Sequence, residues 1–404
     1  MRRSTLLAIT SAAAVIGTAI AAVPVLADGH TGGAATAQGE TGMTQVGVTP
    51  DDLLVPYYTA LKSQIDLPVA PANASLAPDT AITRLAFGSC NHQSRSQEYW
   101  NVIAGDNPQA FLFIGDNNYG DQGWDGDPSL PTLRAAYTKQ AATPELASFR
   151  AQVPMMITWD DHDYGMNDAG GNFAYRQWSE TLFETFWGST SEVQSRPGIY
   201  DSRMVGPEGQ RTQIILLDTR YFRSPMNRMG YTPERPPLGV YLPNEDPAAT
   251  MLGAQQWEWL KVELAKPADF RIIASSIQVL TDAHNYEGWL NFPLEREKLY
   301  MMLAGREDSG MVLLSGDRHA GGIYTEAPEA AGGETLWELT SSSLNFSFST
   351  TERNTAREPD ARRVTDFISE ENYGLIDIDW KARTFTMTMN GNTGEEIVTR
   401  TVEW

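Results

Sequence analysis

The sequence predicts an α/β domain that begins near residue 82 and extends to residue 404. Two observations predict it. Short apolar runs of strand length recur along the chain, and segments with the spacing of amphipathic helices lie between them. A third observation concerns residues 376–404, where alternating apolar and polar residues predict a short antiparallel meander.

Each predicted buried strand is a short apolar run that ends at glycine or polar residues. These runs are Leu85–Phe87, Phe111–Ile114, Met155–Thr158, Ile214–Leu217, Ile272–Ala274 and Met311–Leu314. Helical spacing places Phe183, Phe186 and Trp187 on one face, and Trp257, Leu260 and Leu264 on another. A further helix is predicted to begin at Pro293, because proline is well tolerated in the first turn.

The N-terminal region predicts export. Arg2 and Arg3 precede an apolar run at 6–22 and a small-residue cleavage site before Asp28, so residues 1–27 are interpreted as a signal peptide. The arginine pair also loosely matches a twin-arginine signal. We expect a flexible tether at 28–49 and, at 50–81, an extension that packs on the domain at 82–404, with a helix at 50–69. Cleavage would leave no stable membrane span, and the predicted location is periplasmic or secreted.

Charge limits the classes of partner. The net charge of −21 and the pI near 4.6 argue against nucleic acid as a ligand. The same charge opposes capture of an anionic substrate by the overall field of the protein. A site for an anion must therefore be made locally, by metal ions or a few arginines.

Cys90 is the single cysteine of the chain, so it cannot form an intramolecular disulfide. A free thiol in an oxidising compartment is vulnerable unless it has a use. The usual alternative is a small buried hydrophobic residue. Its place after Gly88 and Ser89, at the end of a predicted strand, favours a metal ligand instead.

Four predicted strands end in clusters of residues that commonly bind metals. Because such strand ends gather at one edge of an open α/β sheet, the clusters predict a polynuclear metal site. Carboxylates dominate, which suggests hard cations beside one metal that accepts thiolate. The clusters are Gly88-Ser89-Cys90-Asn91-His92, Gly115-Asp116-Asn117-Asn118-Tyr119, Trp159-Asp160-Asp161-His162-Asp163 and Gly316-Asp317-Arg318-His319.

Structural alternatives exist for each candidate. Asp116 and Asp317 are also typical turn formers, and Tyr119 could be purely structural. The carboxylates of the Asp160–Asp163 run could face solvent, although their mutual repulsion favours a bound cation. Arg318 could hold a phosphate oxygen or pair with a structural carboxylate. Similar choices between a site role and a structural role concern His92, Gln278 and Asp218. His284, Trp289, Glu295 and Arg296 are interpreted mainly as structural residues that could line an entrance.

With these residues in hand, the chain resembles the PhoD-like alkaline phosphatases, a branch of the calcineurin-like metallophosphoesterases. The motifs are FGSCNHQ at 87–93, GDNNYGD at 115–121, TWDDHDYGMND at 158–168 and SGDRHAGG at 315–322, with support from LLDTRYF at 216–222 and SSIQVL at 275–280. The resemblance implies a four-layer α/β/β/α sandwich with two mixed sheets. Two departures are the absence of an N-terminal β-sandwich and the presence of Arg318 where many members carry an apolar residue.

The resemblance also implies cofactors and roles. Fe³⁺ would be bound by Cys90, Asp116 and Tyr119, and one or two Ca²⁺ would share Asp116. Asp161 matches a metal-bridging asparagine and His162 the adjacent catalytic histidine, whereas Asp317 and His319 match the last metal motif. We add Asp160 as a candidate ligand and Arg318 as a candidate catalytic residue.

The predicted function is hydrolysis of phosphate esters by in-line attack of a metal-bound hydroxide. The substrate would be a small-molecule or lipid phosphate ester, and phosphate would be a product. Within this class, the alternative is a phospholipase D-like phosphodiesterase. From other classes, a non-catalytic surface protein that binds metal or phosphate and an oxidase that uses a tyrosine-bound iron remain as alternatives.

Overall fold

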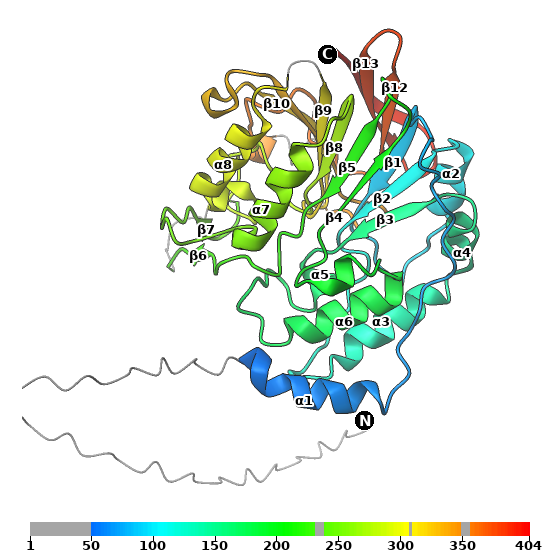
Figure 1. Cartoon of the computed structure of the whole chain (residues 1–404), viewed down its shortest axis with the longest axis vertical. Coiled ribbons are helices and arrows are strands. Elements are labelled where there is room, and N and C mark those ends of the chain that lie inside the picture. Colours follow the sequence, from blue (N-terminus) through cyan, green and yellow to red (C-terminus); the bar gives the residue numbers. More distant parts are fainter. Residues whose placement is uncertain (1–49, 231–237, 307–308, 349–355) are drawn as a thin grey trace, which may run out of the picture. The chain divides into compact units, whose positions relative to one another are not determined.

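Two six-stranded mixed sheets form the centre of the structure, a computed structural model that describes residues 50–230, 238–306, 309–348 and 356–404 (Figure 1). The first sheet has the order β14-β13-β12-β1-β2-β3, in which β1 to β3 are parallel and the other strands antiparallel. Its strands are β1 (Arg84–Gly88), β2 (Ala110–Ile114), β3 (Met155–Thr158), β12 (Asn372–Asp379), β13 (Thr384–Gly391) and β14 (Glu396–Glu403).

The second sheet has the order β10-β11-β9-β8-β5-β4, with four parallel central strands and an antiparallel strand at each edge. Its strands are β4 (Asp201–Val205), β5 (Thr212–Leu216), β8 (Phe270–Ala274), β9 (Gly310–Ser315), β10 (Gly321–Glu326) and β11 (Leu336–Ser341). A separate two-stranded ribbon joins β6 (Asn227–Arg228) to β7 (Tyr241–Leu242).

Helices lie on the outer faces of the sheets. In Figure 1, α2 to α6 lie beside the first sheet and α7 and α8 beside the second. The α-helices are α1 (Pro50–Lys62), α2 (Tyr99–Gly105), α3 (Pro131–Ala141), α4 (Pro144–Arg150), α5 (Asp161–Tyr164), α6 (Arg176–Trp187), α7 (Gly253–Leu264) and α8 (Pro293–Leu303). The described residues also form short 3-10 helices at η1 (Val193–Ser195), η2 (Trp289–Asn291) and η3 (Glu329–Ala331).

Three apolar cores separate four layers. The parallel strands are buried on both faces, and their side chains alternate between cores. In β1, Leu85 points into the core between the two sheets, whereas Ala86 points into the core beneath the helices of the first sheet. In β5, Ile214 joins the central core and Ile215 joins the core under α7 and α8. The predicted four-layer α/β/β/α fold is therefore confirmed.

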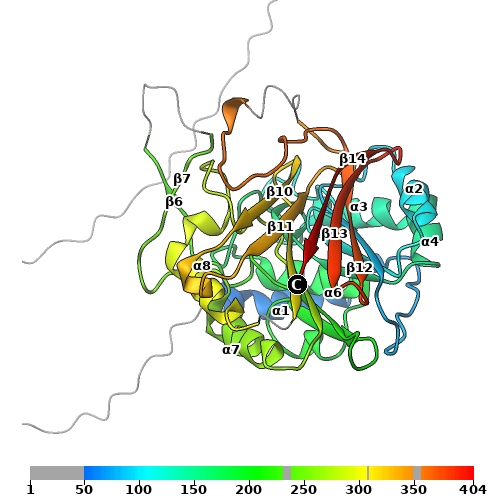
Figure 2. The ribbon, with the colours of Figure 1, turned by 90° about the horizontal axis from the view of Figure 1, so that it is seen from above.

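The sheets meet where β11 approaches β12. A bridge between Ser343 and Asn372 links the segment after β11 to the start of β12, and Figure 2 shows β10 and β11 beside β12 and β13. The six predicted buried strands are all present, as is the C-terminal meander. The meander extends the first sheet, because β12 pairs with β1. Sequence reasoning did not find β4, β10 or β11.

The predicted helix at 50–69 ends earlier, at Lys62. Pro68 and Pro71 follow, and proline disfavours helical backbone in the residue before it. The Tyr58 ring of α1 stacks on Trp178 of α6 at 5.1 Å between centroids, so this helix packs on the domain. The signal at 1–27 and the tether at 28–49 lie outside the described residues.

No helix within the described part of the chain is both long enough and apolar enough to cross a bilayer.

The topology brings the ends of the parallel strands of both sheets to one edge. Cys90 follows β1, Asp116 follows β2 and Asp160 follows β3 in the first sheet. From the second sheet, Ser276 follows β8 and Asp317 follows β9. Hydrogen bonds cross between the sheets here, including the one from the Ser276 hydroxyl to Asp160 Oδ1 at 2.6 Å. The candidate site therefore lies where both sheets end.

Candidate metal centre

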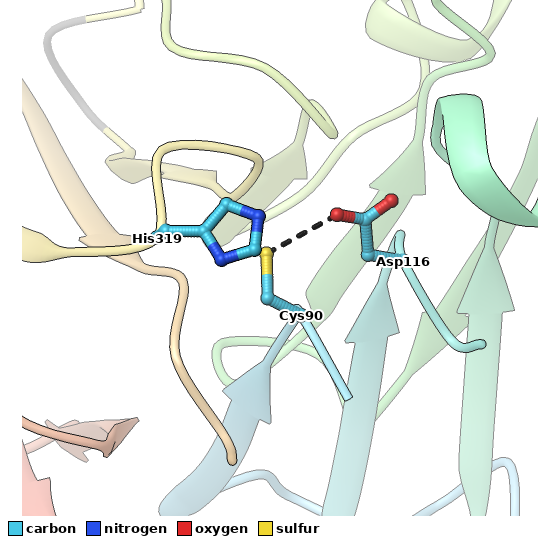
Figure 3. A group of neighbouring side chains, drawn as sticks. All are labelled: Cys90, Asp116 and His319. Atoms are coloured by element: carbon cyan, nitrogen blue, oxygen red, sulfur yellow. Dashed lines mark hydrogen bonds between the residues drawn. The ribbon is translucent and has the colours of Figure 1, made fainter. Parts of the chain in front are cut away.

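Cys90 lies in a group of four potential ligands. Its Sγ atom is 3.3 Å from Asp116 Oδ2, and the His319 ring joins the group with its ligand atom within 4.8 Å of the others (Figure 3). The Tyr119 hydroxyl lies 3.0 Å from Asp116 Oδ2 and 3.2 Å from His319 Nε2. The structure thus brings together one thiol, one carboxylate, one phenol and one imidazole from three strand ends.

A second group shares Asp116 with the first. Ligand atoms of Asp116, Asp160, Asp161 and Asp317 all lie within 4.8 Å of one another, and Asp116, Asp161 and His162 form an overlapping group. Asp116 is common to these groups, so it stands where a carboxylate would bridge two ions. Two adjoining cation positions are therefore available around Asp116.

Several buried oxygen atoms in these groups have no hydrogen-bond partner among the described residues. They are Asp116 Oδ1, Asp160 Oδ2 and Asp161 Oδ1. An unpaired polar group in a protein interior is costly, and a carboxylate costs more. Bound cations would satisfy these oxygens, so the donor set fits the metals that the sequence implies.

Burial and mutual repulsion raise proton affinity in the carboxylate group. Burial first, and then the neighbouring carboxylates, raise the pKa of Asp116 and of Asp317 well above the usual range. Burial also raises the pKa of the Cys90 thiol, and the charge of Asp116 adds to that effect. A cation would reverse each of these shifts, because it favours the thiolate and the carboxylate. The electrostatic environment of the site therefore favours the binding of cations.

The backbone at the strand ends adopts unusual conformations. Cys90, Asp116, Asp317 and His319 all have left-handed backbone, with φ of 58°, 49°, 64° and 52°. Such conformations cost on the order of 1 kcal/mol for a residue with a Cβ atom, and they cluster at functional sites. Four strained residues in two overlapping ligand groups indicate that the loops are shaped for ligand placement.

Asp160 is held by the second sheet. Its Oδ1 atom accepts hydrogen bonds from Arg220 Nε at 2.6 Å and from the Ser276 hydroxyl at 2.6 Å. Its backbone N–H donates to Asp163 Oδ1 at 2.7 Å, which caps the start of α5. Burial, countered by Arg220, raises the pKa of Asp160 to about 6. Only Oδ2 remains for a metal ion.

His162 pairs with a carboxylate that sequence reasoning left without a role. Its Nδ1 atom lies 2.7 Å from Asp121 Oδ1, and Asp121 Oδ2 accepts the Asn167 N–H at 3.0 Å. Burial lowers the pKa of His162, but Asp161, Asp116 and Asp121 outweigh burial and raise it to about 11. In return, and against the effect of burial, His162 and Arg220 hold the pKa of Asp161 below its usual range. The Nδ1–H bond leaves Nε2 for a reacting group.

His319 has a different environment. Its Nδ1 atom lies 2.6 Å from the Phe346 carbonyl oxygen, which accepts a hydrogen bond from Nδ1–H. The other ring nitrogen, Nε2, lies near the Tyr119 hydroxyl. Burial lowers the pKa of His319 to about 4, so the ring is neutral near pH 7. A neutral imidazole whose other nitrogen donates to a carbonyl is the usual form of a metal-bound histidine.

Arg318 lies on the wall of the site. It forms an ion pair with the buried Glu358, and its guanidinium lies 4.7 Å from the Tyr286 ring centre and 5.1 Å from that of Phe367. It lines a cavity of about 490 Å³ that also contains Asp161, His162, Asp317 and His319. Of its two sequence interpretations, the structure shows the pairing with a carboxylate.

The remaining polar candidates take supporting positions. The half-buried His92 ring stacks on Tyr119 at 5.2 Å between centroids. Gln278 donates to Thr340 Oγ1 at 3.0 Å and contacts His284 Nε2 at 3.1 Å.

Asp218 accepts hydrogen bonds from the backbone N–H groups of Ile199, Arg220 and Tyr221. Glu295 accepts from Trp257 Nε1 and Met251 N, and Arg296 pairs with Asp282, so both are structural.

Sequence reasoning missed a third acidic group beside the first two. Asp161, Asp168 and Glu287 place ligand atoms within 4.8 Å of one another. Glu287 forms ion pairs with Arg220, at 2.6 Å, and with Arg223. Asp168 was the last residue of a quoted motif, as Asp121 was, so both had a signal. Glu287 follows no apolar run, and no sequence pattern marks it.

Comparisons with known proteins show similarity to one phosphatase family. The family model of the PhoD-like phosphatases matches residues 195–389, which include the Asp317–His319 motif but not the first three motifs. Alkaline phosphatase D of Bacillus subtilis is 22% identical over 301 residues, which cover 65% of this chain and 51% of the relative. The chain thus spans about half the length of that curated relative.

A solved structure of PhoD has the same fold. The two chains match with a TM-score of 0.61 at 17% sequence identity. The match covers 83% of this chain and 70% of the PhoD chain. The resemblance that the four motifs predict is therefore confirmed, and this chain is similar to the PhoD-like phosphatases in sequence and in fold.

Proposed function

We propose that the chain is an exported, metal-dependent phosphoesterase that hydrolyses phosphate monoesters. The observation that carries the proposal is the pair of overlapping ligand groups around Asp116, which opens into a cavity of about 490 Å³. The similarity to alkaline phosphatase D supports the reaction class. The apolar run and small-residue site in residues 1–27 support export.

The residues divide into two ligand sets. Cys90, Asp116, Tyr119 and His319 would hold the iron, because a thiolate and a phenolate suit Fe³⁺. Asp116, Asp160, Asp161 and Asp317 would hold calcium, which prefers carboxylate oxygens. When bound, the cations would supply water activation and neutralise charge on the phosphoryl oxygens.

His162 moves the proton. Its Nδ1–H is fixed by Asp121, so Nε2 carries the proton that the leaving oxygen needs. Asp121, which belongs to neither ligand set, raises the pKa of His162 and so favours the protonated ring. Arg318 is held by Glu358 and two rings, so we assign it to positioning of the ester within the cavity.

The pairing of His162 with Asp121 disfavours the non-catalytic alternative. A protein that only binds metal, or phosphate through a metal, needs the carboxylates of the ligand groups, but it does not need a histidine that another carboxylate orients. The phosphodiesterase alternative uses the same residues. Rates on p-nitrophenyl phosphate and bis(p-nitrophenyl) phosphate, measured on one preparation, distinguish a monoesterase from a diesterase.

Visible absorption tests the iron assignment. We expect a broad visible band in the purified protein, which Tyr119→Phe weakens because the phenolate is lost. Tyr99→Phe is the matched control, since Tyr99 is equally buried but donates to Asn91 Oδ1, outside the ligand groups. A colourless protein, with activity unchanged in Cys90→Ser, would refute the iron assignment.

Activity tests the proposal as a whole. We expect hydrolysis of p-nitrophenyl phosphate to be lost on calcium chelation and restored by added Ca²⁺. Asp116→Asn should abolish it, because Asp116 belongs to both ligand sets. Full activity in Asp116→Asn would overturn the metal-dependent mechanism.

A further inference from the structure

Four aromatic side chains are among the residues that line the cavity beside the ligand groups. Acidic and imidazole groups of the metal centre line it, and so do Tyr241, Tyr286, Phe346 and Phe348. Tyr286 and Phe348 remain 40% and 52% exposed, so part of each ring is accessible to a ligand. The cavity therefore offers apolar contact directly beside the position of the phosphoryl group.

These rings are held by neighbouring groups. Phe348 stacks on His319 at 4.1 Å between centroids, with 25° between the ring planes. Phe346 packs edge-on against His319 at 4.8 Å and against Tyr119 at 4.8 Å. The Tyr241 hydroxyl donates to Asp168. Rigid aromatic surfaces lose little conformational entropy on binding a ligand.

The lining of this cavity offers little to a charged leaving group. Arg318 is the one arginine or lysine among the described residues that line this cavity, and Glu358 already neutralises it. Asp168 and Glu287 line the cavity as well, and their oxygens already accept from Tyr241, Arg220 and Arg223, so they offer no donor to a second phosphate or a carboxylate. Among the described residues that line this cavity, no arginine or lysine without an acidic partner is available to a nucleoside diphosphate or a sugar bisphosphate, and Arg357 lines a separate, adjoining cavity of about 110 Å³.

We propose that the cavity selects phosphate monoesters whose leaving group is an uncharged aromatic ring, an inference that rests on the proposed phosphoesterase function. The ring packs against Tyr286 and Phe348 while the phosphoryl group faces Asp161 and Asp317. In the reaction the P–O bond to the aryl oxygen breaks, and water supplies the oxygen that completes the released phosphate. The proton from His162 Nε2 ends on the phenol, and a proton of the water restores the histidine.

Competitive inhibition by phosphonates, which are not hydrolysed, tests the inference without differences in leaving-group reactivity. We expect phenylphosphonate to bind about tenfold or more tightly than methylphosphonate, with cyclohexylphosphonate between them. Phe348→Ala and Tyr286→Leu should bring the ratio of phenyl to methyl inhibition constants close to one. Met301→Ala is the control, because Met301 is 56% exposed on α8, outside the cavity lining.

A second measurement separates failure of the inference from failure of the function. Saturation-transfer NMR with p-cresol and metal-free protein should show contact with the aromatic ring, and Phe348→Ala should reduce it. If p-cresol contacts wild type but neither phosphonate inhibits, the proposed function fails and the aromatic site stands. Equal inhibition by phenyl- and methylphosphonate, or p-cresol contact that is unchanged in Phe348→Ala, would overturn the inference. Preferential capture of phosphatidate vesicles over phenylphosphonate would point to a lipid leaving group and would also overturn it.

Discussion

Asp121 decides which nitrogen of His162 faces the cavity. Its Oδ1 lies 2.7 Å from Nδ1, and the backbone N–H of Asn167 fixes its other oxygen. We predict that Asp121→Asn lowers kcat for p-nitrophenyl phosphate by roughly 10- to 100-fold, because the proton donor loses its orientation and charge partner. The substitution also removes one cause of the raised pKa of His162.

The pH dependence of activity in Asp121→Asn shows in which direction the pKa of His162 changes. A donor works only while it is protonated, so activity falls as pH rises through its pKa. In Asp121→Asn the pKa of His162 decreases, and the decline should move to lower pH. Asp125→Asn, in the same loop but exposed, is the control and should keep the wild-type profile. A profile that does not move in Asp121→Asn would rule out this positioning role.

At the scale of elements, the end of β2 depends on a glycine. Gly115 has φ of +112°, and a Cβ atom there would lie 2.6 Å from Asp160 Cβ and 3.1 Å from Ser276 Cβ. We predict that Gly115→Ala destabilises the protein by about 3 kcal/mol or more and displaces Asp160. Gly123→Ala is the matched control, because Gly123 has φ of +76° and no neighbour within 4 Å, so only about 1 kcal/mol of backbone strain is expected. Equal losses in both variants, measured by chemical denaturation, would contradict the proposed crowding.

The elements show how far sequence reasoning extends. A buried parallel strand needs a run of apolar residues, so β1, β2, β3, β5, β8 and β9 were visible, and with them the ligands at their ends. β10 was not visible, because it begins with Gly321 and Gly322 and has no apolar run. Its contact with Met389 forms only in the folded chain. Glu287 joins the site through a long loop, and the pairing of Arg318 with Glu358 spans 40 residues. Contacts of that kind leave no local pattern.

At the scale of the whole molecule, two sheets converge on one cluster of buried carboxylates. Bound cations should therefore stabilise the fold as well as support catalysis. We predict that chelation lowers Tm, since a ligand present at about 1,000 times its Kd contributes about 4 kcal/mol to stability. For a domain of this size the expected decrease is on the order of 5 °C or more. Differential scanning calorimetry before and after chelation measures it, and restoration of Tm by Ca²⁺ is the control.

The metal-free protein should also become less stable as pH rises. Burial raises the pKa of Asp160 to about 6 and that of Asp116 well above its usual range, so between the ordinary and the raised values the folded state holds more protons than the unfolded state. Stability then falls as pH increases through this window. In the loaded protein cations replace those protons, and the decline should be absent. Parallel pH profiles for loaded and metal-free protein would refute this account.

The left-handed backbone at Cys90, Asp116, Asp317 and His319 has a consequence for mutational tolerance. Aspartate, asparagine and histidine enter this conformation more readily than other residues with a side chain, and glycine enters it freely. Folding and metal binding therefore select overlapping but different residues at the same four positions. A saturation library sorted first for soluble expression and then for activity should separate them: asparagine or glycine would pass the first sort and fail the second, whereas valine or isoleucine would fail both.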